Sequence, residues 1–167
     1  MKCITSVSYS ILVNGVEQEV FLPSKGLQQG NPLSPILYVM CSEGLSSLID
    51  DKVIRSLIQG ANASPSRICV SHLLFADDSL AFFRASRSDC SEFLDMLNIY
   101  QLAAGQEVNF SKSSVYFSQN VSDSMKLDLQ QMLGIDKCLT NSNYLGMHIL
   151  LGRNKKFPSS ICVIGLG

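Results

Sequence analysis

The sequence predicts an α+β fold in which helices pack on an antiparallel sheet. Runs of β-forming residues joined by tight turns occur at residues 4–22 and 71–83. Each pair is followed by a stretch with apolar residues at helical spacing, the first starting near Ser34 and the second near Asp89. The resulting order, ββα, ββα, then β, α and β, is typical of helices covering an antiparallel sheet.

The composition is typical of a folded domain. Of the 167 residues, 46% are hydrophobic. No apolar run approaches the roughly 18 residues that a membrane span needs. The formal net charge is −1, from 13 Lys and Arg against 14 Asp and Glu. Strong non-specific binding of nucleic acid usually shows as a basic surplus, which is missing here.

Six cysteines are scattered along the chain, with no Cys-x-x-Cys spacing and only two histidines. Structural zinc ligands usually come in closely spaced pairs, so no zinc site is predicted. Because no signal peptide is recognisable, we expect reduced thiols and an intracellular protein, in the nucleus or the cytoplasm.

The first predicted element is a β-hairpin. Residues 4–13 and 16–22 are rich in β-formers, and Asn14-Gly15 lies between them. Asn-Gly is the strongest short hairpin signal because both central residues must accept positive φ. A two-stranded ribbon is marginal in water, so we expect it to need a packing partner.

A loop at residues 25–35 leads into the first predicted helix. Ser34 is a suitable N-cap, and Pro35 suits the first turn, where its missing N–H is not needed. Apolar residues between 37 and 49 mark one helical face. Gly26 and Gly30 allow close approach of a substrate or another backbone, the alternative being a plain connector.

Two adjacent acids, Asp77 and Asp78, stand between apolar runs in residues 71–83. This pattern predicts two buried strands joined by an acidic turn, with Phe75 in the core. Carboxylates held on rigid strands suit a hard divalent cation, which takes oxygen ligands. The alternative is an ordinary polar turn that faces water.

The remaining elements are two helices and two extended segments. Asp89 and Glu92 read as a capping box that starts the second helix, and Gly105 is a suitable stop. A β-prone run follows at 114–118, then a helix at 122–134 and an extended segment from Tyr144.

Four stretches, taken in order, resemble the reverse transcriptase of non-LTR (LINE-type) retrotransposons, especially those of plants. The agreement in order and spacing extends over roughly residues 3–156. The four are residues 26–35 (GLQQGNPLSP, similar to motif B), 75–78 (FADD, motif C), 105–113 (GQEVNFSKS, motif D) and 144–146 (YLG, the block that follows).

The resemblance implies a polymerase palm, an antiparallel sheet with packed helices, at residues 1–156. Residues 157–167 depart from the family pattern, and neither fingers nor a complete thumb is expected. The implied partners are an RNA template, a DNA primer and dNTPs, and the implied cofactor is Mg2+, with two ions per site.

The same resemblance assigns roles to single residues. Asp77 is implied as the principal metal ligand and Asp78 as its partner. Lys112 is the implied proton donor or charge stabiliser for pyrophosphate, with an ordinary surface lysine as the alternative. The residues implied in template and substrate binding are Gln29, Gly30, Pro32 and Ser34, of which Gln29 and Gly30 would lie under the nascent base pair.

One departure from the family bears on activity. The palm of the family has a further acid in motif A, on a strand upstream of motif B, and no segment here matches it. One acidic turn does not supply all the carboxylates that two cations need. We therefore interpret the chain as part of an RNA-directed DNA polymerase, a nucleotidyltransferase of a retrotransposon remnant, inactive alone and a weak binder of magnesium. Three alternatives stay open: an active subunit completed by another chain, a non-catalytic RNA- or protein-binding domain, and a reading frame without a stable product.

Overall fold

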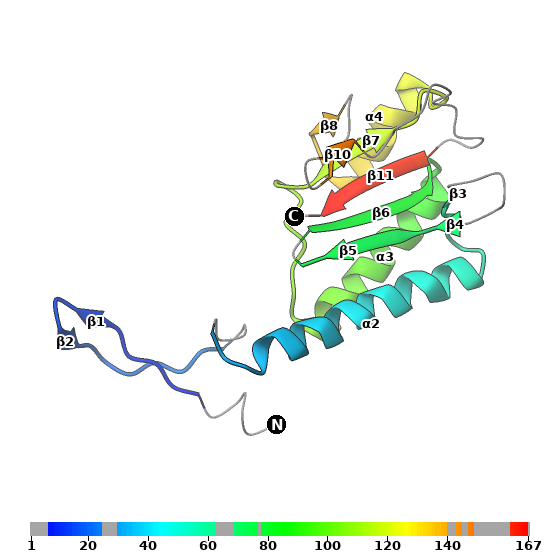
Figure 1. Ribbon diagram of the computed structural model, residues 1–167. Coiled ribbons are helices and arrows are strands. Elements are labelled where there is room, and N and C mark those ends of the chain that lie inside the picture. Colours follow the sequence, from blue (N-terminus) through cyan, green and yellow to red (C-terminus); the bar gives the residue numbers. More distant parts are fainter. Residues whose placement is uncertain are drawn as a thin grey trace. The chain divides into compact units, whose positions relative to one another are not determined.

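The computed structural model of the chain describes residues 7–24, 30–62, 69–76 and 78–139, together with the backbone of three later strand segments, 143–144, 147–148 and 161–166. Two compact units are present, Met1–Cys41 and Ser42–Gly167. Figure 1 shows the course of the chain through both units.

The first unit contains the predicted hairpin. Strands β1 (Leu12–Val13) and β2 (Val16–Glu17) pair antiparallel. Asn14 and Gly15 between them have φ values of 50° and 80°. The hairpin prediction is therefore confirmed. An isolated bridge between Tyr9 and Phe21 extends the ribbon, whose apolar side chains are exposed.

The second unit is built on a five-stranded sheet with the order β5-β6-β11-β7-β8. All its pairs are antiparallel except β7–β8. The strands are β5 (His72–Phe75), β6 (Asp78–Arg84), β7 (Ser114–Phe117), β8 (Cys138–Leu139) and β11 (Ile161–Leu166). Two small antiparallel pairs join β3 (Ala61–Asn62) to β4 (Cys69–Val70) and β9 (Asn143–Tyr144) to β10 (Met147–His148).

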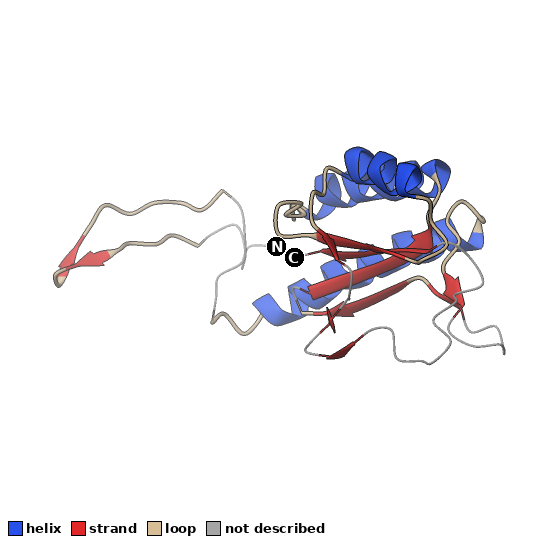
Figure 2. Ribbon diagram, turned by 90° about the horizontal axis from the view of Figure 1, so that it is seen from above, coloured by secondary structure: helices blue, strands red, loops and turns tan. Residues whose placement is uncertain are grey.

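The helices in the described part of the chain are α2 (Ser34–Ile54), α3 (Arg87–Ala104) and α4 (Asp123–Leu133). Residues 42–54 of α2 belong to the second unit together with α3 and α4. Figure 2 shows the helices as elements separate from the layer of strands. None of the helices in the described part combines the length and the apolar composition that a membrane span requires.

The side chains of the sheet alternate between two apolar clusters. Phe83 and Val115 belong to the main core, with Leu45 and Ile49 of α2, Phe93, Met96 and Leu97 of α3, and Leu129 and Leu133 of α4. Leu80 and Phe82 form a smaller cluster with Ala61, against which Val70 and Tyr116 pack. The helices therefore cover one face of the sheet, and the β3–β4 pair lies over part of the other. The predicted α+β class is confirmed.

One predicted helix start is wrong. The N-cap of α3 is Ser86, whose hydroxyl accepts a bond from the backbone N–H of Asp89 at 3.2 Å. Asp89 is therefore the third residue of the helix and not its cap. The predicted stop at Gly105 is confirmed, since this glycine is a left-handed C-cap. The helix predicted at 122–134 is α4, whose N-cap Ser122 accepts from Met125 N–H and whose left-handed C-cap is Gly134.

Candidate functional site

The acidic turn lies between β5 and β6, as predicted. Phe75, the last residue of β5, pairs with Asp78, the first residue of β6. Asp78 is exposed, and Asp77 lies outside the described residues. The turn also contains Ala76, which has φ of 49°. A residue other than glycine in this left-handed region is strained by about 1–2 kcal/mol.

The prediction that Phe75 lies in the core is wrong, because 60% of its surface is exposed. Phe75 pairs with Asp78, and Leu73 pairs with Leu80 on the same side. That side faces away from the helices, and β5 is the outermost strand of the sheet. Leu73 is likewise 45% exposed. The turn is thus carried by an edge strand that is covered on its helix-facing side.

The register of the sheet places Asp78 and Lys112 at the same end of the sheet, where strands β6 and β7 begin. Strands β6 and β7 both pair antiparallel with β11, so they run in the same direction. Gly165 of β11 pairs with Leu80 on one side and with Ser114 on the other. Asp78 stands two residues before Leu80, and Lys112 two residues before Ser114. The two strands are two sheet spacings apart, about 10 Å.

Lys112 is exposed and belongs to a turn organised by Asn109. The backbone N–H of Lys112 donates to Asn109 Oδ1 at 3.2 Å, and the Ser113 hydroxyl donates to the Asn109 carbonyl at 2.8 Å. An Asx-type turn fixes the backbone at this point. The turn therefore presents the exposed Lys112 at the end of the sheet where Asp78 also lies.

The predicted template-binding residues belong to the other unit. Gln29 lies outside the described residues. Gly30 has φ of 85°, which favours glycine, and among the described residues no atom beyond its chain neighbours lies within 4 Å of where a Cβ would stand. Pro32 is exposed, and α2 begins at Ser34 itself, after a turn in which Asn31 Oδ1 accepts from Leu33 N–H at 2.9 Å. Asn31 therefore organises the turn that leads to the predicted helix start.

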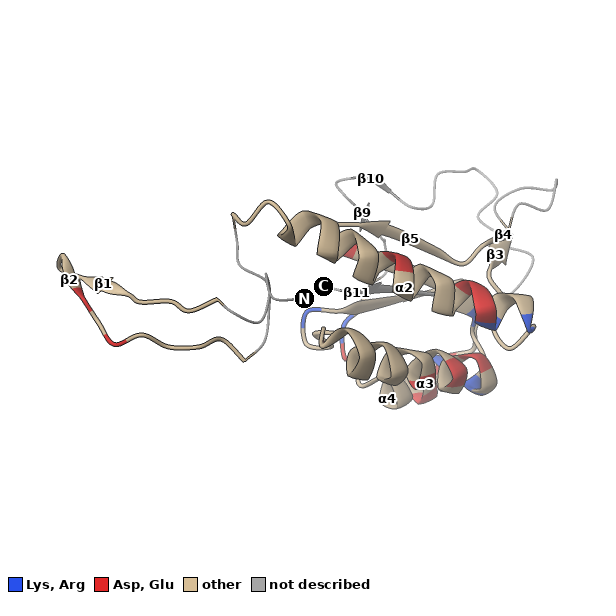
Figure 3. Cartoon of the chain, turned by 90° about the horizontal axis from the view of Figure 1, so that it is seen from below, with Lys and Arg blue, Asp and Glu red and all other residues tan. Residues whose placement is uncertain are grey.

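No group of three or more His, Cys, Asp or Glu residues in the described part could hold a metal ion. Figure 3 shows that many of the Asp and Glu residues in view lie on α2 and α3. Near the β7–β8 end of the sheet, burial raises the pKa of the Tyr116 hydroxyl and of the Cys138 thiol further above their ordinary values. Because the described residues offer no such group, a cation at the β5–β6 turn would depend on the turn itself, on water and on phosphate oxygens.

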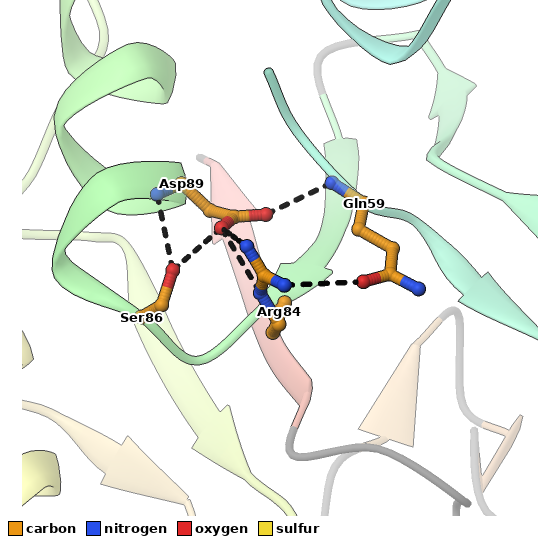
Figure 4. A network of polar contacts seen from close by, with 4 residues as sticks. All are labelled: Gln59, Arg84, Ser86 and Asp89. Atoms are coloured by element: carbon orange, nitrogen blue, oxygen red, sulfur yellow. Dashed lines mark hydrogen bonds and ion pairs between the residues drawn. The ribbon is translucent and has the colours of Figure 1, made fainter. Parts of the chain in front are cut away.

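A buried network at the other end of β6 was not predicted from the sequence (Figure 4). Asp89 is fully buried, and its Oδ1 accepts from Arg84 Nη2 at 2.8 Å and from the Ser86 hydroxyl. Its Oδ2 accepts from the Gln59 backbone N–H at 2.9 Å. The carboxylate therefore joins the end of β6, the start of α3 and the segment after α2. These contacts assign it a structural role, away from the acidic turn.

His72 forms a second polar link, between α2 and β5. Its Nε2 lies 2.7 Å from Ser46 Oγ, and its Nδ1 lies 2.9 Å from Ser71 Oγ and 4.0 Å from Asp50 Oδ1. Both ring nitrogens thus have hydroxyl partners in a half-buried position. His72 is the first residue of β5, so its contact with Ser46 holds the start of this strand against α2. The same strand leads to the acidic turn.

Comparison with known proteins identifies the family of the chain. Residues 1–149 match the family model described as reverse transcriptase (RNA-dependent DNA polymerase). An uncharacterized mitochondrial protein of Arabidopsis thaliana is 34% identical over 108 residues, which are 64% of this chain and 86% of that protein. A retrovirus-related Pol polyprotein from a type-2 retrotransposable element of Drosophila melanogaster is 30% identical over 99 residues, 59% of this chain but 8% of that protein. No solved structure matches. The resemblance seen in the sequence is thereby confirmed, and the chain belongs to the reverse transcriptase family.

Proposed function

We propose that the chain is a palm-like fragment of an RNA-directed DNA polymerase from a non-LTR retrotransposon remnant, and that it does not polymerise DNA alone. The chain belongs to the reverse transcriptase family and has an acidic turn between β5 and β6, at the same end of the sheet as Lys112. This observation supports the proposal best. We assign residues 1–156 to the partial palm. The family generally binds template and primer and uses divalent metal ions.

The proposed roles of the acidic turn and of Lys112 follow from their placement at the same end of the sheet. Asp77 and Asp78 would ligate Mg2+, which prefers carboxylate oxygens supplemented by water and phosphate. Lys112 would stabilise the charge of departing pyrophosphate, since its side chain is exposed at the same end of the sheet as the acidic turn. Gln29, Gly30, Pro32 and Ser34 would contact template and substrate in front of α2, where Gly30 leaves room for close approach.

The proposed inactivity rests on the number of ligands. In-line phosphoryl transfer by two metal ions needs several oxygen ligands that clamp both the attacking and the leaving oxygen. The described residues hold no cluster of three candidate ligands, and β11, the strand next to Asp78, consists of Ile, Cys, Val, Ile, Gly and Leu. We therefore expect magnesium binding to be weak.

The test is primer extension by the purified chain with an RNA template, a DNA primer, dNTPs and Mg2+. We expect no incorporation, and robust extension that Asp77→Asn and Asp78→Asn abolish would refute the proposed inactivity. A magnesium titration followed by NMR checks the site itself. The amide signals of Asp78 and Ser79 should shift in the wild type and stay unchanged in the double Asn variant, while Asp95→Asn, an exposed position on α3, serves as the control.

A non-catalytic protein-binding role is the second candidate. The β1–β2 ribbon exposes apolar side chains that a soluble surface rarely gathers, among them Ile11, Leu12, Val13, Val16, Val20 and Leu22. An RNA-binding role is favoured less, because the net charge is −1. Salt-dependent RNA binding without magnesium would reverse this preference.

A further inference from the structure

Strand β5, which leads to the acidic turn, is the outermost strand of the sheet (Figure 1). In the part of the chain that the structure describes, it pairs with β6 alone. None of its four residues is buried, whereas residues 80–83 of β6 all are. Of the two strands that carry the turn, β5 is therefore the one whose position depends on few contacts.

Two side chains of β5 point towards the helix layer. Leu74 is partly buried and packs against the main core, and His72 contacts Ser46 of α2. The other two residues, Leu73 and Phe75, are exposed on the opposite face. Apolar packing is non-directional, whereas a hydrogen bond sets both a distance and an angle. Of the two contacts with the helix layer, the bond of His72 is therefore the one that can set the direction of the strand.

Two hydroxyls hold the imidazole of His72. Nε2 lies 2.7 Å from Ser46 Oγ, and Nδ1 lies 2.9 Å from Ser71 Oγ. A hydroxyl can donate or accept, so both ring nitrogens are paired in either neutral tautomer. Asp50 Oδ1 lies 4.0 Å from Nδ1, which is beyond hydrogen-bond distance. Because Ser71 is the chain neighbour of His72, the bond to Ser46 is the one that joins β5 to another element.

The start of β5 bears on the acidic turn because the strand is short. His72 pairs with Ala81 of β6, and Phe75, three residues further along, pairs with Asp78. Three residues of extended chain span about 10 Å. No glycine or proline interrupts the strand. A change in tilt at His72 is therefore passed along the backbone to the turn.

We propose that His72 is a positioning residue for the acidic turn and that it acts through the bond between its Nε2 and Ser46 of α2. The bond sets the tilt of the edge strand against the helix, and the strand sets where the turn between Phe75 and Asp78 stands. The consequence for a metal ion rests on the proposed function, in which the carboxylates of the turn ligate Mg2+. The tether itself rests only on the contacts of His72.

Amide hydrogen exchange of the full chain tests the tether. Glutamine can place its amide nitrogen close to the position of Nε2, whereas asparagine reaches only about as far as Nδ1. His72→Gln should therefore leave the exchange of residues 73–75 and 78–80 as in the wild type. His72→Asn and His72→Leu should accelerate it by about fivefold, the effect of one lost hydrogen bond. Ser46→Ala should do the same, and Ser47→Ala, at the exposed neighbouring position on α2, should not.

The amides of α3 separate a positioning role from a general loss of stability. They should exchange at the same rate in all the variants, because the tether acts on β5 and the turn. An acceleration that extends equally to α3 would overturn the proposal, since His72 would then support the whole unit. If His72→Leu does not fold, the comparison of Ser46→Ala with Ser47→Ala decides. Exchange of residues 73–75 and 78–80 that is no faster in Ser46→Ala than in Ser47→Ala would also overturn the proposal.

A magnesium titration followed at the Ser79 amide separates this inference from the proposed function. His72→Leu and Ser46→Ala should weaken binding by about tenfold, the lower end of what the loss of a supporting contact costs a metal site. His72→Gln should bind magnesium as the wild type does. Equal affinities in all variants, despite faster exchange at the turn, would refute the positioning role of His72. No response in the wild type would instead refute the metal role of the turn, and the exchange measurements would then decide the tether by themselves.

Discussion

Replacement of Asp89 by alanine should destabilise the second unit by about 2–4 kcal/mol. The carboxylate is fully buried and accepts from the Arg84 guanidinium, the Ser86 hydroxyl and the Gln59 backbone N–H. Breaking a buried ion pair costs about 3–5 kcal/mol when the remaining charge stays buried. The side chain of Arg84 is 49% exposed and can regain water, which lowers the cost, whereas the Gln59 N–H loses its carboxylate partner.

The assay is urea unfolding followed by far-ultraviolet circular dichroism, since the chain contains no tryptophan. Asp95→Ala, an exposed position on the same helix, is the matched control and should change the free energy of unfolding by less than about 0.5 kcal/mol. Asp89→Asn should lie between the two, because the amide oxygen can still accept one of the bonds. Equal stabilities of Asp89→Ala and Asp95→Ala would refute a supporting role for the network.

Three further substitutions or reactions test other parts of the structure. Ala76→Gly should stabilise the β5–β6 turn by about 1 kcal/mol, because glycine adopts φ of 49° without strain; unchanged or lower stability in urea would contradict this. Iodoacetamide at pH 8 should modify exposed Cys69 within the time that leaves Cys90 intact, since burial, and then the nearby Asp128 and Asp89 carboxylates, raise the pKa of the Cys90 thiol to about 11; equal labelling by mass spectrometry would refute its burial. Because this pKa is above the usual 9.0, the stabilising effect of the neutral thiol should be complete below pH 9 and be lost as the pH rises towards 11. Gly60→Ala should lower the melting temperature, because a Cβ there would stand 2.8 Å from the Val70 carbonyl oxygen; an unchanged melting temperature would show that the β3–β4 pair can yield.

The elements that the sequence predicts well are those set by local chemistry. Asn14-Gly15 forms its hairpin turn with two positive φ values, and Gly105 and Gly134 end their helices in the left-handed region. In these cases a few neighbouring residues decide the backbone conformation by themselves. The acidic hairpin follows the same logic, since a short polar turn joins two neighbouring strands that pair with each other.

The errors arise where distant residues decide. Ser86 and not Asp89 caps α3, because the Asp89 carboxylate is held by Arg84 and Gln59 from other elements. Phe75 is exposed because its strand is at the sheet edge, which no local pattern reveals. β11 was not predicted at all, although Ile161, Val163 and Ile164 are β-branched. Its two partners are strands far away in the sequence.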